Sequence, residues 1–334
     1  MLQNTRRHRR QSTCRSAAIR FAVPALALAL VLAAVSATGC GKGSAVTTTA
    51  ATAASTTAKA PPTTGTSIPV TTKPPTTVTS AASTTTTVSA SLKLNVYFVR
   101  GETVAAMHRT VGASAATSDT EKLTGAVQAL LAGPNASEKA LGTSTAIPAG
   151  TKLLGVKVDP SSQIATIDLS GDFESGGGSL SMSLRLAQMV YTLTQFDGIQ
   201  KVQFSLDGKQ VTVFGGEGIV LDHPVGRADY EDMTPAILVD SVAPGDTITS
   251  PLLVSGTANV FEAVFRVQLL DAQGNKLIDQ VVNATSGTGT RGTFSEELPF
   301  PVTATGQGKV VVFADSPKDG SQIDVVEIPV TLGK

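Results

Sequence analysis

Residues 92–111 read LKLNVYFVRGETVAAMHRTV and carry the first clear secondary-structure pattern after a long stretch of small and polar residues. Their first eight residues are rich in β-branched and aromatic side chains, which favour a strand. Arg100-Gly101 supplies a turn, and residues 102–111 then predict the partner strand of a β-hairpin. Ordered structure is therefore expected to begin at Leu92.

A helix is predicted next, in residues 118–134 (SDTEKLTGAVQALLAGP). Ser118 and Glu121 have the spacing of a capping box, in which each side chain binds the backbone of the other residue. Gly133-Pro134 ends the helix. One face carries apolar residues at helical spacing: Leu123, Ala126, Val127, Leu130 and Leu131.

More strands and a second helix follow. Residues 151–170 predict two strands joined at residues 159–162, and a glycine-rich loop, 171–179, then leads into an apolar helix capped by Ser179 or Ser181. Residues 199–214 predict a hairpin that turns on Asp207-Gly208. This order predicts an α+β domain with helices packed on a mixed sheet.

Helical patterns disappear after residues 227–233 (RADYEDM). About seven short strands in roughly a hundred residues predict an all-β immunoglobulin-like sandwich. Turns at Pro244-Gly245, residues 273–275 and Asp319-Gly320 separate these strands. The region has no Cys and no Trp, so it lacks the disulfide and the buried Trp of antibody domains.

The N-terminus has the layout of an export signal. Residues 1–20 contain six arginines and no acid, and residues 21–38 are almost wholly apolar. About eighteen apolar residues also approach the minimum for a membrane-spanning helix, so an uncleaved anchor and plain secretion remain alternatives.

Ala37-Thr38-Gly39 before Cys40 resembles the lipobox of bacterial lipoproteins, although Ala37 stands where Leu or Val is usual. Cys14 would be discarded with the signal, which leaves Cys40 without a disulfide partner. Acylation removes the thiol and adds chains worth about 0.8 kcal/mol per buried methylene. We predict a signal peptide over residues 1–39 and lipid attachment, of palmitate type, at Cys40, which would anchor the chain outside the cytoplasm.

Residues 40–91 predict a disordered stalk. They are dominated by Thr, Ala, Ser and Pro and contain no acid, so they bury too little apolar surface to fold. Such Ser/Thr-rich stretches with Pro are often O-glycosylated. Without the six arginines of the signal, 20 basic residues face 26 acidic ones, and this balance of about −6 excludes nucleic-acid binding.

Several separated motifs resemble one bacterial domain family, GerMN, the sporulation and germination module. They are VYFVRGETV (96–104), VQALLAGP (127–134), TAIPAGTKLLGVKVD (145–159), ATIDLSGDFESGGGSLS (165–181) and VQFSLDGK (202–209). The resemblance covers about 140 residues.

The GerMN resemblance spans residues 92–232, and residues 233–334 look like the immunoglobulin-like domain of bacterial spore germination. This resemblance implies a non-catalytic cell-envelope protein of an actinobacterial type. GerMN domains are similar to the ring-building folds of sporulation channels, which makes homo-oligomers conceivable and leaves the oligomeric state open. The stalk fits a role that spans the cell wall.

Neither histidine beyond the signal has a catalytic or zinc-site pattern around it. We expect His108 to be structural within a strand and His223 to lie in a loop. Cysteine catalysis is excluded, and no Ser stands in a Gly-x-Ser-x-Gly motif. The glycine-rich loop lacks the Gly-Lys-Ser/Thr ending of a phosphate-binding loop.

Asp168, Asp172 and Glu174 allow two functional interpretations, a carboxylate pair for glycoside hydrolysis or a Ca²⁺ site. The chain has no Trp and only three Tyr to stack on sugars, so a solvated loop is preferred. Residues 227–233 are interpreted as a connector with local ion pairs, each worth under about 1 kcal/mol.

The sequence therefore predicts a non-catalytic envelope lipoprotein that binds envelope proteins or peptidoglycan, with no cofactor and no metal. Exposed edge strands are the expected docking sites. Two alternatives stay open: a cell-wall hydrolase that uses Asp168, Asp172 or Glu174, and a carrier of a small ligand with a pocket between the two domains.

Overall fold

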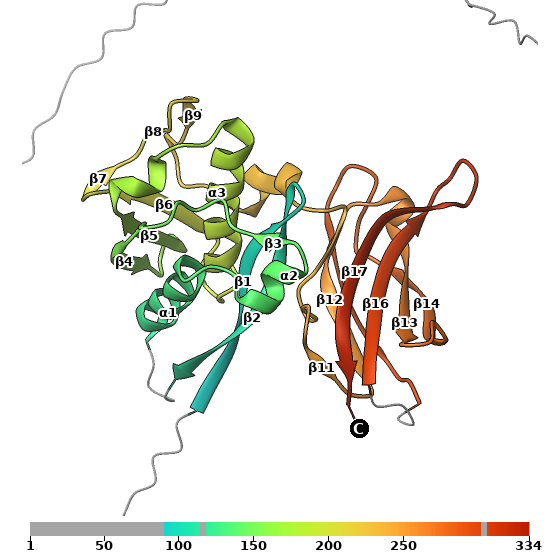
Figure 1. Cartoon of the computed structure of the whole chain (residues 1–334). Coiled ribbons are helices and arrows are strands. Elements are labelled where there is room, and N and C mark those ends of the chain that lie inside the picture. Colours follow the sequence, from blue (N-terminus) through green and yellow to red (C-terminus); the bar gives the residue numbers. More distant parts are fainter. Residues whose placement is uncertain (1–89, 114–117, 302–305, 334) are drawn as a thin grey trace, which may run out of the picture. The chain divides into compact units, whose positions relative to one another are not determined.

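The computed structural model describes residues 90–113, 118–301 and 306–333 (Figure 1). The predicted signal peptide, Cys40 and the stalk up to residue 89 lie outside these residues. Two separate hydrophobic cores are present, one in the α+β domain and one in the β-sandwich. No helix in the described ranges is long and apolar enough to cross a membrane.

The first hairpin is confirmed. Strands β1 (Ala90–Arg100) and β2 (Thr103–Ala113) pair antiparallel along their whole length, with Arg100 opposite Thr103 at the turn. A two-residue strand, β3 (Thr143–Ser144), pairs with the end of β1. These strands form a sheet of their own, in the order β2-β1-β3.

A mixed sheet forms the second layer, as predicted. Its order is β4-β5-β6-β7, with β5 parallel to β6 and the other pairs antiparallel. The β6–β7 turn falls on Asp207-Gly208, where both residues have positive φ (47° and 77°), as the Asp-Gly pair favours. The strands are β4 (Leu153–Asp159), β5 (Ile164–Leu169), β6 (Lys201–Leu206) and β7 (Lys209–Gln210).

Both predicted helices are present. Helix α1 (Asp119–Leu131) begins with the expected capping box between Ser118 and Glu121. Helix α3 (Ser179–Leu193) is buried on most sides, also as expected. The shorter elements are α2 (Ala136–Ala140), η1 (Gly171–Glu174), η2 (Arg227–Met233), β8 (Val213–Phe214) and β9 (Ile219–Val220).

The predicted cap of α3 was wrong. The N-cap residue is Gly178, and no side chain caps the helix. Ser179 lies one residue too late in the helix, and its hydroxyl donates instead to Glu217 Oε2 at 2.7 Å. This bond ties the start of α3 to the β8–β9 turn.

Side chains of α3 and of the turn that follows it take the place of a strand along the second edge of β1. Gln195 accepts from the N–H of Asn95 (2.7 Å) and donates to its carbonyl (2.6 Å). Thr192 Oγ1 accepts from the N–H of Tyr97 (3.1 Å), and Gln188 donates to the Tyr97 carbonyl (3.0 Å). Gln188 and Thr192 are four residues apart on one face of α3, and Gln195 follows in the turn after the helix. The edge of β1 is therefore satisfied by the helix, which explains why β1 does not join the mixed sheet.

The C-terminal part is an immunoglobulin-like sandwich of two sheets, ordered β10-β12-β15 and β11-β17-β16-β13-β14. Among its described residues, one three-residue 3₁₀ turn, η3 (Phe261–Ala263), lies between the strands. The strands are β10 (Ile237–Val239), β11 (Thr247–Ile248), β12 (Leu252–Ala258), β13 (Val264–Asp271), β14 (Lys276–Asn283), β15 (Gly292–Leu298), β16 (Gly306–Asp315) and β17 (Gln322–Leu332).

Strand β10 contributes to both cores. Ile237 and Val239 belong to the sandwich core, whereas Leu238 between them belongs to the core of the α+β domain. Alternate residues of a strand point to opposite faces, so one short strand can bury side chains in two domains. All three residues are buried.

We expect Gln188→Leu to lower the free energy of unfolding by about 2–4 kcal/mol, because it leaves the buried Tyr97 carbonyl and the Ala146 N–H without partners. Urea unfolding measures this. The matched control is Gln200→Leu at an exposed position, where the change should stay within about 0.5 kcal/mol. Equal losses in the two variants would contradict the proposed role of Gln188.

Candidate functional site

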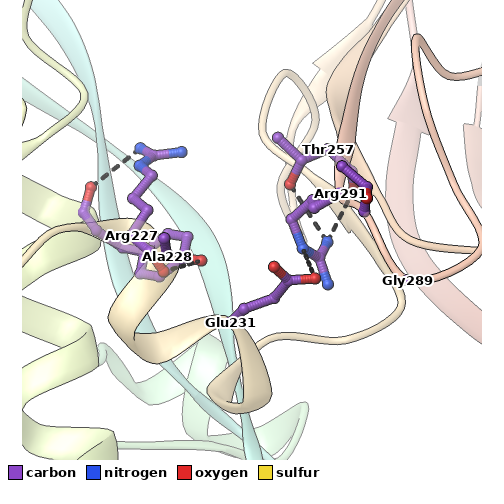
Figure 2. Close-up of a pocket in the computed structure, with 8 residues that line it drawn as sticks. Arg227, Ala228, Glu231, Thr257, Gly289 and Arg291 are labelled. Atoms are coloured by element: carbon purple, nitrogen blue, oxygen red, sulfur yellow. Dashed lines mark hydrogen bonds and ion pairs between the residues drawn. The ribbon is translucent and has the colours of Figure 1, made fainter.

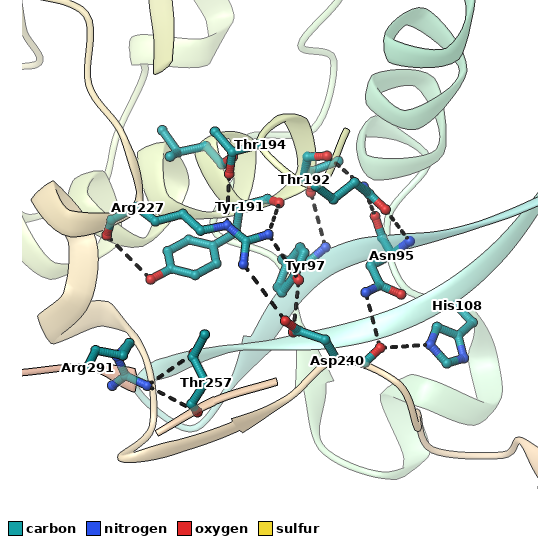
Figure 3. Close-up of polar contacts among 12 residues, drawn as sticks. Asn95, Tyr97, His108, Tyr191, Thr192, Thr194, Arg227, Asp240, Thr257 and Arg291 are labelled. Atoms are coloured by element: carbon teal, nitrogen blue, oxygen red, sulfur yellow. Dashed lines mark hydrogen bonds and ion pairs between the residues drawn. The ribbon is translucent and has the colours of Figure 1, made fainter. Parts of the chain in front are cut away.

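Polar side chains from both domains meet around Asp240, directly after β10 (Figure 3). The Tyr97 hydroxyl donates to Asp240 Oδ1 at 2.9 Å, and Asn95 Nδ2 donates to the Asp240 carbonyl at 3.1 Å. Both residues lie on β1, far from Asp240 in sequence. With His108, Arg227 and Asp246 these residues form what we call the domain-contact cluster.

Arg227 completes the surroundings of Asp240. Its guanidinium carbon lies 4.7 Å from the Tyr191 ring centroid and 5.5 Å from that of Tyr97, within the range of cation–π attraction. Nε donates to Thr194 Oγ1 at 2.9 Å, and Nη1 is 3.8 Å from Asp240 Oδ2. Arg227 therefore links α3, β1 and the start of the sandwich.

The prediction of local ion pairs in residues 227–233 was wrong. Arg227 pairs with Asp240, and Glu231 lies 3.4 Å from Arg291 Nε in the sandwich. Glu231 also accepts from Asn259 Nδ2 at 2.7 Å. The segment turns as the 3₁₀ helix η2, so its charged side chains point outward to different neighbours rather than to one another.

Burial dominates the electrostatics of the cluster. It raises the pKa of Asp240, although the charge of Arg227 and the Tyr97 hydrogen bond act in the opposite direction. Burial also raises the pKa of the Tyr97 hydroxyl, and the neighbouring Asp240 raises it further. Tyr97 therefore stays protonated and remains a hydrogen-bond donor.

His108 lies in β2, where the sequence placed it in a strand, and it contacts the sandwich through both ring nitrogens. Nδ1 is 2.6 Å from Asp246 Oδ2, and Nε2 is 3.2 Å from the Asp240 carbonyl. Burial acts to raise the pKa of Asp246, but its bonds to His108 and to the Ala243 N–H, with the charge of Lys93, hold that pKa below its ordinary value of 3.8.

A cavity of about 370 Å³, here called the interdomain cavity, opens beside the cluster (Figure 2). Arg291 crosses it: Nη2 donates to the Pro235 carbonyl at 3.0 Å, while Nε is buried without an aligned hydrogen-bond partner among the described residues. Its lining residues are Tyr191, Arg227, Ala228, Glu231, Thr257, Gly289, Thr290 and Arg291. The cavity lies where the small-ligand alternative requires one.

The carboxylates suggested for hydrolysis have local structural contacts. Asp168 Oδ1 accepts from the Gly208 N–H at 3.0 Å in the β6–β7 turn, and Asp172 Oδ2 accepts from Ser170 Oγ at 3.2 Å. Glu174 and His223 are exposed. Within the part of the chain that the structure describes, no three His, Cys, Asp or Glu residues gather as a metal site would require.

Sequence reasoning missed Asp240, Asp246 and Asn95 as contact residues. No local pattern identifies them, because their partners lie more than 100 residues away. For Asp240, the only sequence signal was that an acidic residue directly follows a short strand.

Comparison with protein families gives two matches. Residues 95–212 match the Germane model, described as sporulation and spore germination, and residues 236–321 match Gmad2, described as the immunoglobulin-like domain of bacterial spore germination. The chain carries a Germane domain followed by a Gmad2 domain. The family resemblance seen in the sequence is thereby confirmed, and the domain-contact cluster joins the Germane domain to the Gmad2 domain.

Three solved structures are similar at low identity. A candidate lipoprotein from Clostridium perfringens is 22% identical over 43% of this chain and 93% of its own, with a TM-score of 0.31. The first GerMN domain of the Bacillus subtilis sporulation protein GerM is 20% identical over 41% and 99%, with a TM-score of 0.32. Its tandem GerMN domains are 17% identical over 62% and 61%, with a TM-score of 0.34. No curated protein matches the chain.

At neutral pH we expect Asp246→Asn to lower the free energy of unfolding by about 1–2 kcal/mol, because the charged bond between the Germane and Gmad2 domains is lost. An aspartate with a lowered native pKa stabilises the fold above its unfolded-state pKa and loses that contribution as the pH falls through the native pKa. The difference between wild type and variant should therefore shrink below pH 3.8. Urea unfolding between pH 7 and pH 2.5 measures it.

The control for this experiment is Asp222→Asn. Asp222 and His223 also lie 2.6 Å apart, but both side chains are more than half exposed, so the loss should stay below about 0.5 kcal/mol. A difference at Asp246 that persists unchanged at pH 2.5 would contradict the ionic origin of its effect.

Proposed function

We propose that this chain is a non-catalytic cell-envelope lipoprotein whose Germane and Gmad2 domains act together as an interaction module. The observation that carries the proposal is the domain-contact cluster: His108, Arg227, Asp240 and Asp246 are used to hold the two domains against each other. Because these contacts fix the two domains against each other, residues of both domains form one defined surface. Neither family description names an enzymatic activity.

The extracytoplasmic location rests on the sequence. A basic segment, an apolar segment and Ala37-Thr38-Gly39 precede Cys40, and a Thr/Ala/Pro-rich stalk follows it. Acyl chains on Cys40 would hold the chain at the membrane while the stalk carries the two domains into the wall. A role in sporulation or germination belongs to the same proposal, since both domain families are described by it.

Edge strands are the proposed docking surfaces. Among the described residues, β2 and β14 each pair with only one neighbouring strand. The free edge of such a strand presents unpaired backbone groups that can add a strand from another protein. Val281 on β14 is exposed and adds an apolar contact.

The lipid anchor is tested by metabolic labelling with a palmitate analogue in a bacterial host that acylates exported proteins. We expect wild type to be labelled and to enter the detergent phase, because the acyl chains are apolar, and Cys40→Ser to do neither. Cys14→Ser is the matched control and should behave as wild type, since residue 14 lies in the predicted signal. Labelling that survives in Cys40→Ser would remove the lipoprotein assignment.

The interaction role is tested by crosslinking the full chain in envelopes and recovering it through a C-terminal tag. We expect envelope proteins or wall fragments to be recovered, and fewer of them with Cys40→Ser. Recovery of the chain alone, without retention on the wall, would count heavily against an interaction module.

The non-catalytic part is tested with purified peptidoglycan. We expect no release of soluble fragments by the full chain, because Asp168 and Asp172 stabilise local turns. Fragment release that disappears in Asp172→Ala would instead establish the wall-hydrolase alternative.

A further inference from the structure

His108 lies at the domain contact with an oxygen atom of the Gmad2 domain facing each of its ring nitrogens. Nδ1 is 2.6 Å from Asp246 Oδ2. Nε2 is 3.2 Å from the Asp240 carbonyl (Figure 3). The histidine itself belongs to β2 of the Germane domain. Its side chain is only 9% exposed, so the ring is largely shielded from water.

Neither of these two oxygens can donate a hydrogen bond to the ring. A backbone carbonyl only accepts. Burial acts to raise the pKa of Asp246, but its bonds and the neighbouring positive charges hold that pKa below its ordinary value of 3.8, so Asp246 is a carboxylate at neutral pH. A neutral imidazole has one N–H and one lone pair, and it could therefore bond only one of the two oxygens. The doubly protonated ring of His108 bonds both.

The cations around the domain-contact cluster are each paired with an acid. They are Lys93 on β1, Arg109 on β2, Arg227 on η2 and Arg291 in the sandwich, and their partners in that order are Asp246, Glu138, Asp240 and Glu231. Lys93 is 58% exposed, so water and salt screen its charge. Asp246 is therefore the charged group in direct contact with the His108 ring, and its charge complements an imidazolium.

We propose that His108 is a pH-sensitive switch in the contact between the Germane and Gmad2 domains. With two ring protons it donates one bond to Asp246 and one to the Asp240 carbonyl, and both bonds join the domains. When one proton leaves to water, one of these bonds is lost and a ring lone pair faces an oxygen. A side chain that binds in its charged form contributes while it stays charged, and this contribution is lost as the pH rises. The domain contact is therefore tight in mild acid and looser in mild alkali.

This inference rests on the proposed composite surface and adds its regulation. Histidine ordinarily changes its charge near about pH 6.5, and protonation of histidines at interfaces is a recurrent way to switch them. A looser contact would change the surface that residues of both domains form together. The stability of the contact can be measured without any partner, so failure of this inference is distinct from failure to recover envelope partners.

Nitrogen NMR of the full chain, labelled in its histidine rings and held in a nonionic detergent, detects the ring protons directly. We expect the His108 ring to carry a proton on both nitrogens at pH 5.5 and on one nitrogen at pH 8.5. The variants His8→Gln and His223→Gln assign its signals, because each removes one of the other two histidines. A His108 ring that is neutral at pH 5.5, or still doubly protonated at pH 8.5, would overturn the proposal.

Urea unfolding of a double-mutant cycle measures the coupling between His108 and Asp246. The cycle compares wild type, His108→Gln, Asp246→Asn and the double variant. We expect the coupling, expressed as a factor in the unfolding equilibrium constant, to be about tenfold larger at pH 5.5 than at pH 8.5. The reason is that a bond between two charged groups becomes a bond with a neutral donor. Equal coupling at the two pH values would contradict the switch.

The matched control is the same cycle at His223 and Asp222. This pair has the same separation of 2.6 Å, but its side chains are 60% and 67% exposed and are adjacent in sequence. Its coupling should stay below about threefold at both pH values, because exposed pairs are screened by water. A pH-dependent coupling as large as that of His108 would show that the effect needs no burial between domains, and the proposal would fail.

Recovery of crosslinked envelope partners tests the regulatory role. We expect wild type to recover severalfold more partner at pH 5.5 than at pH 8.5, because the composite surface is fixed only while both bonds are present. His108→Gln should recover equal amounts at the two pH values. Equal recovery by wild type at both pH values would remove the regulatory role of His108 and leave the interaction module standing.

Discussion

The partly buried carboxylate of Asp240 is the constraint on which the two-domain arrangement depends. Removing a carboxylate from water is costly unless donors and a positive charge replace its hydration. Tyr97 and Arg227 provide these from two elements of the α+β domain, whereas Asp240 itself belongs to the Gmad2 domain. Any arrangement that separates the domains leaves Asp240 and Arg227 to find new partners. The contact is therefore specific as well as stabilising, and Leu238 adds apolar burial beside it.

Helix α3 links this contact to the rest of the Germane domain. Gln188, Thr192 and Gln195 close the edge of β1. Tyr191 and the C-cap residue Thr194 contact Arg227. The helix thus satisfies one sheet edge and positions the cation that faces Asp240. Among the described residues, β2 keeps one edge without a strand partner, and so does β14 in the Gmad2 sandwich.

The short 3₁₀ segment η2 contributes to both cavities. Arg227 and Glu231 line the interdomain cavity, while Asp229, Tyr230 and Asp232 line a second cavity, of about 280 Å³, between η2, β9 and α3. The backbone of Tyr230 departs from helical geometry, with φ of −127°, which separates the two sets of side chains. This seven-residue connector therefore contacts the sandwich on one side and lines a cavity of the α+β domain on the other.

The sequence by itself determined the elements whose causes are local. The first hairpin, the capping box of Ser118 and Glu121, and the Asp207-Gly208 turn follow from residues only a few positions apart. The alternation of helices and strands also follows from local patterns. The spaced motifs indicated the family. The cap of α3 failed because Ser179 has a better partner in Glu217, 38 residues away. Only the tertiary structure decided the site: Tyr97 and Asp240 are 143 residues apart, and Arg291 meets Pro235 across 56. Contacts between residues so far apart in sequence depend on how the two cores pack, and no local sequence pattern predicts them.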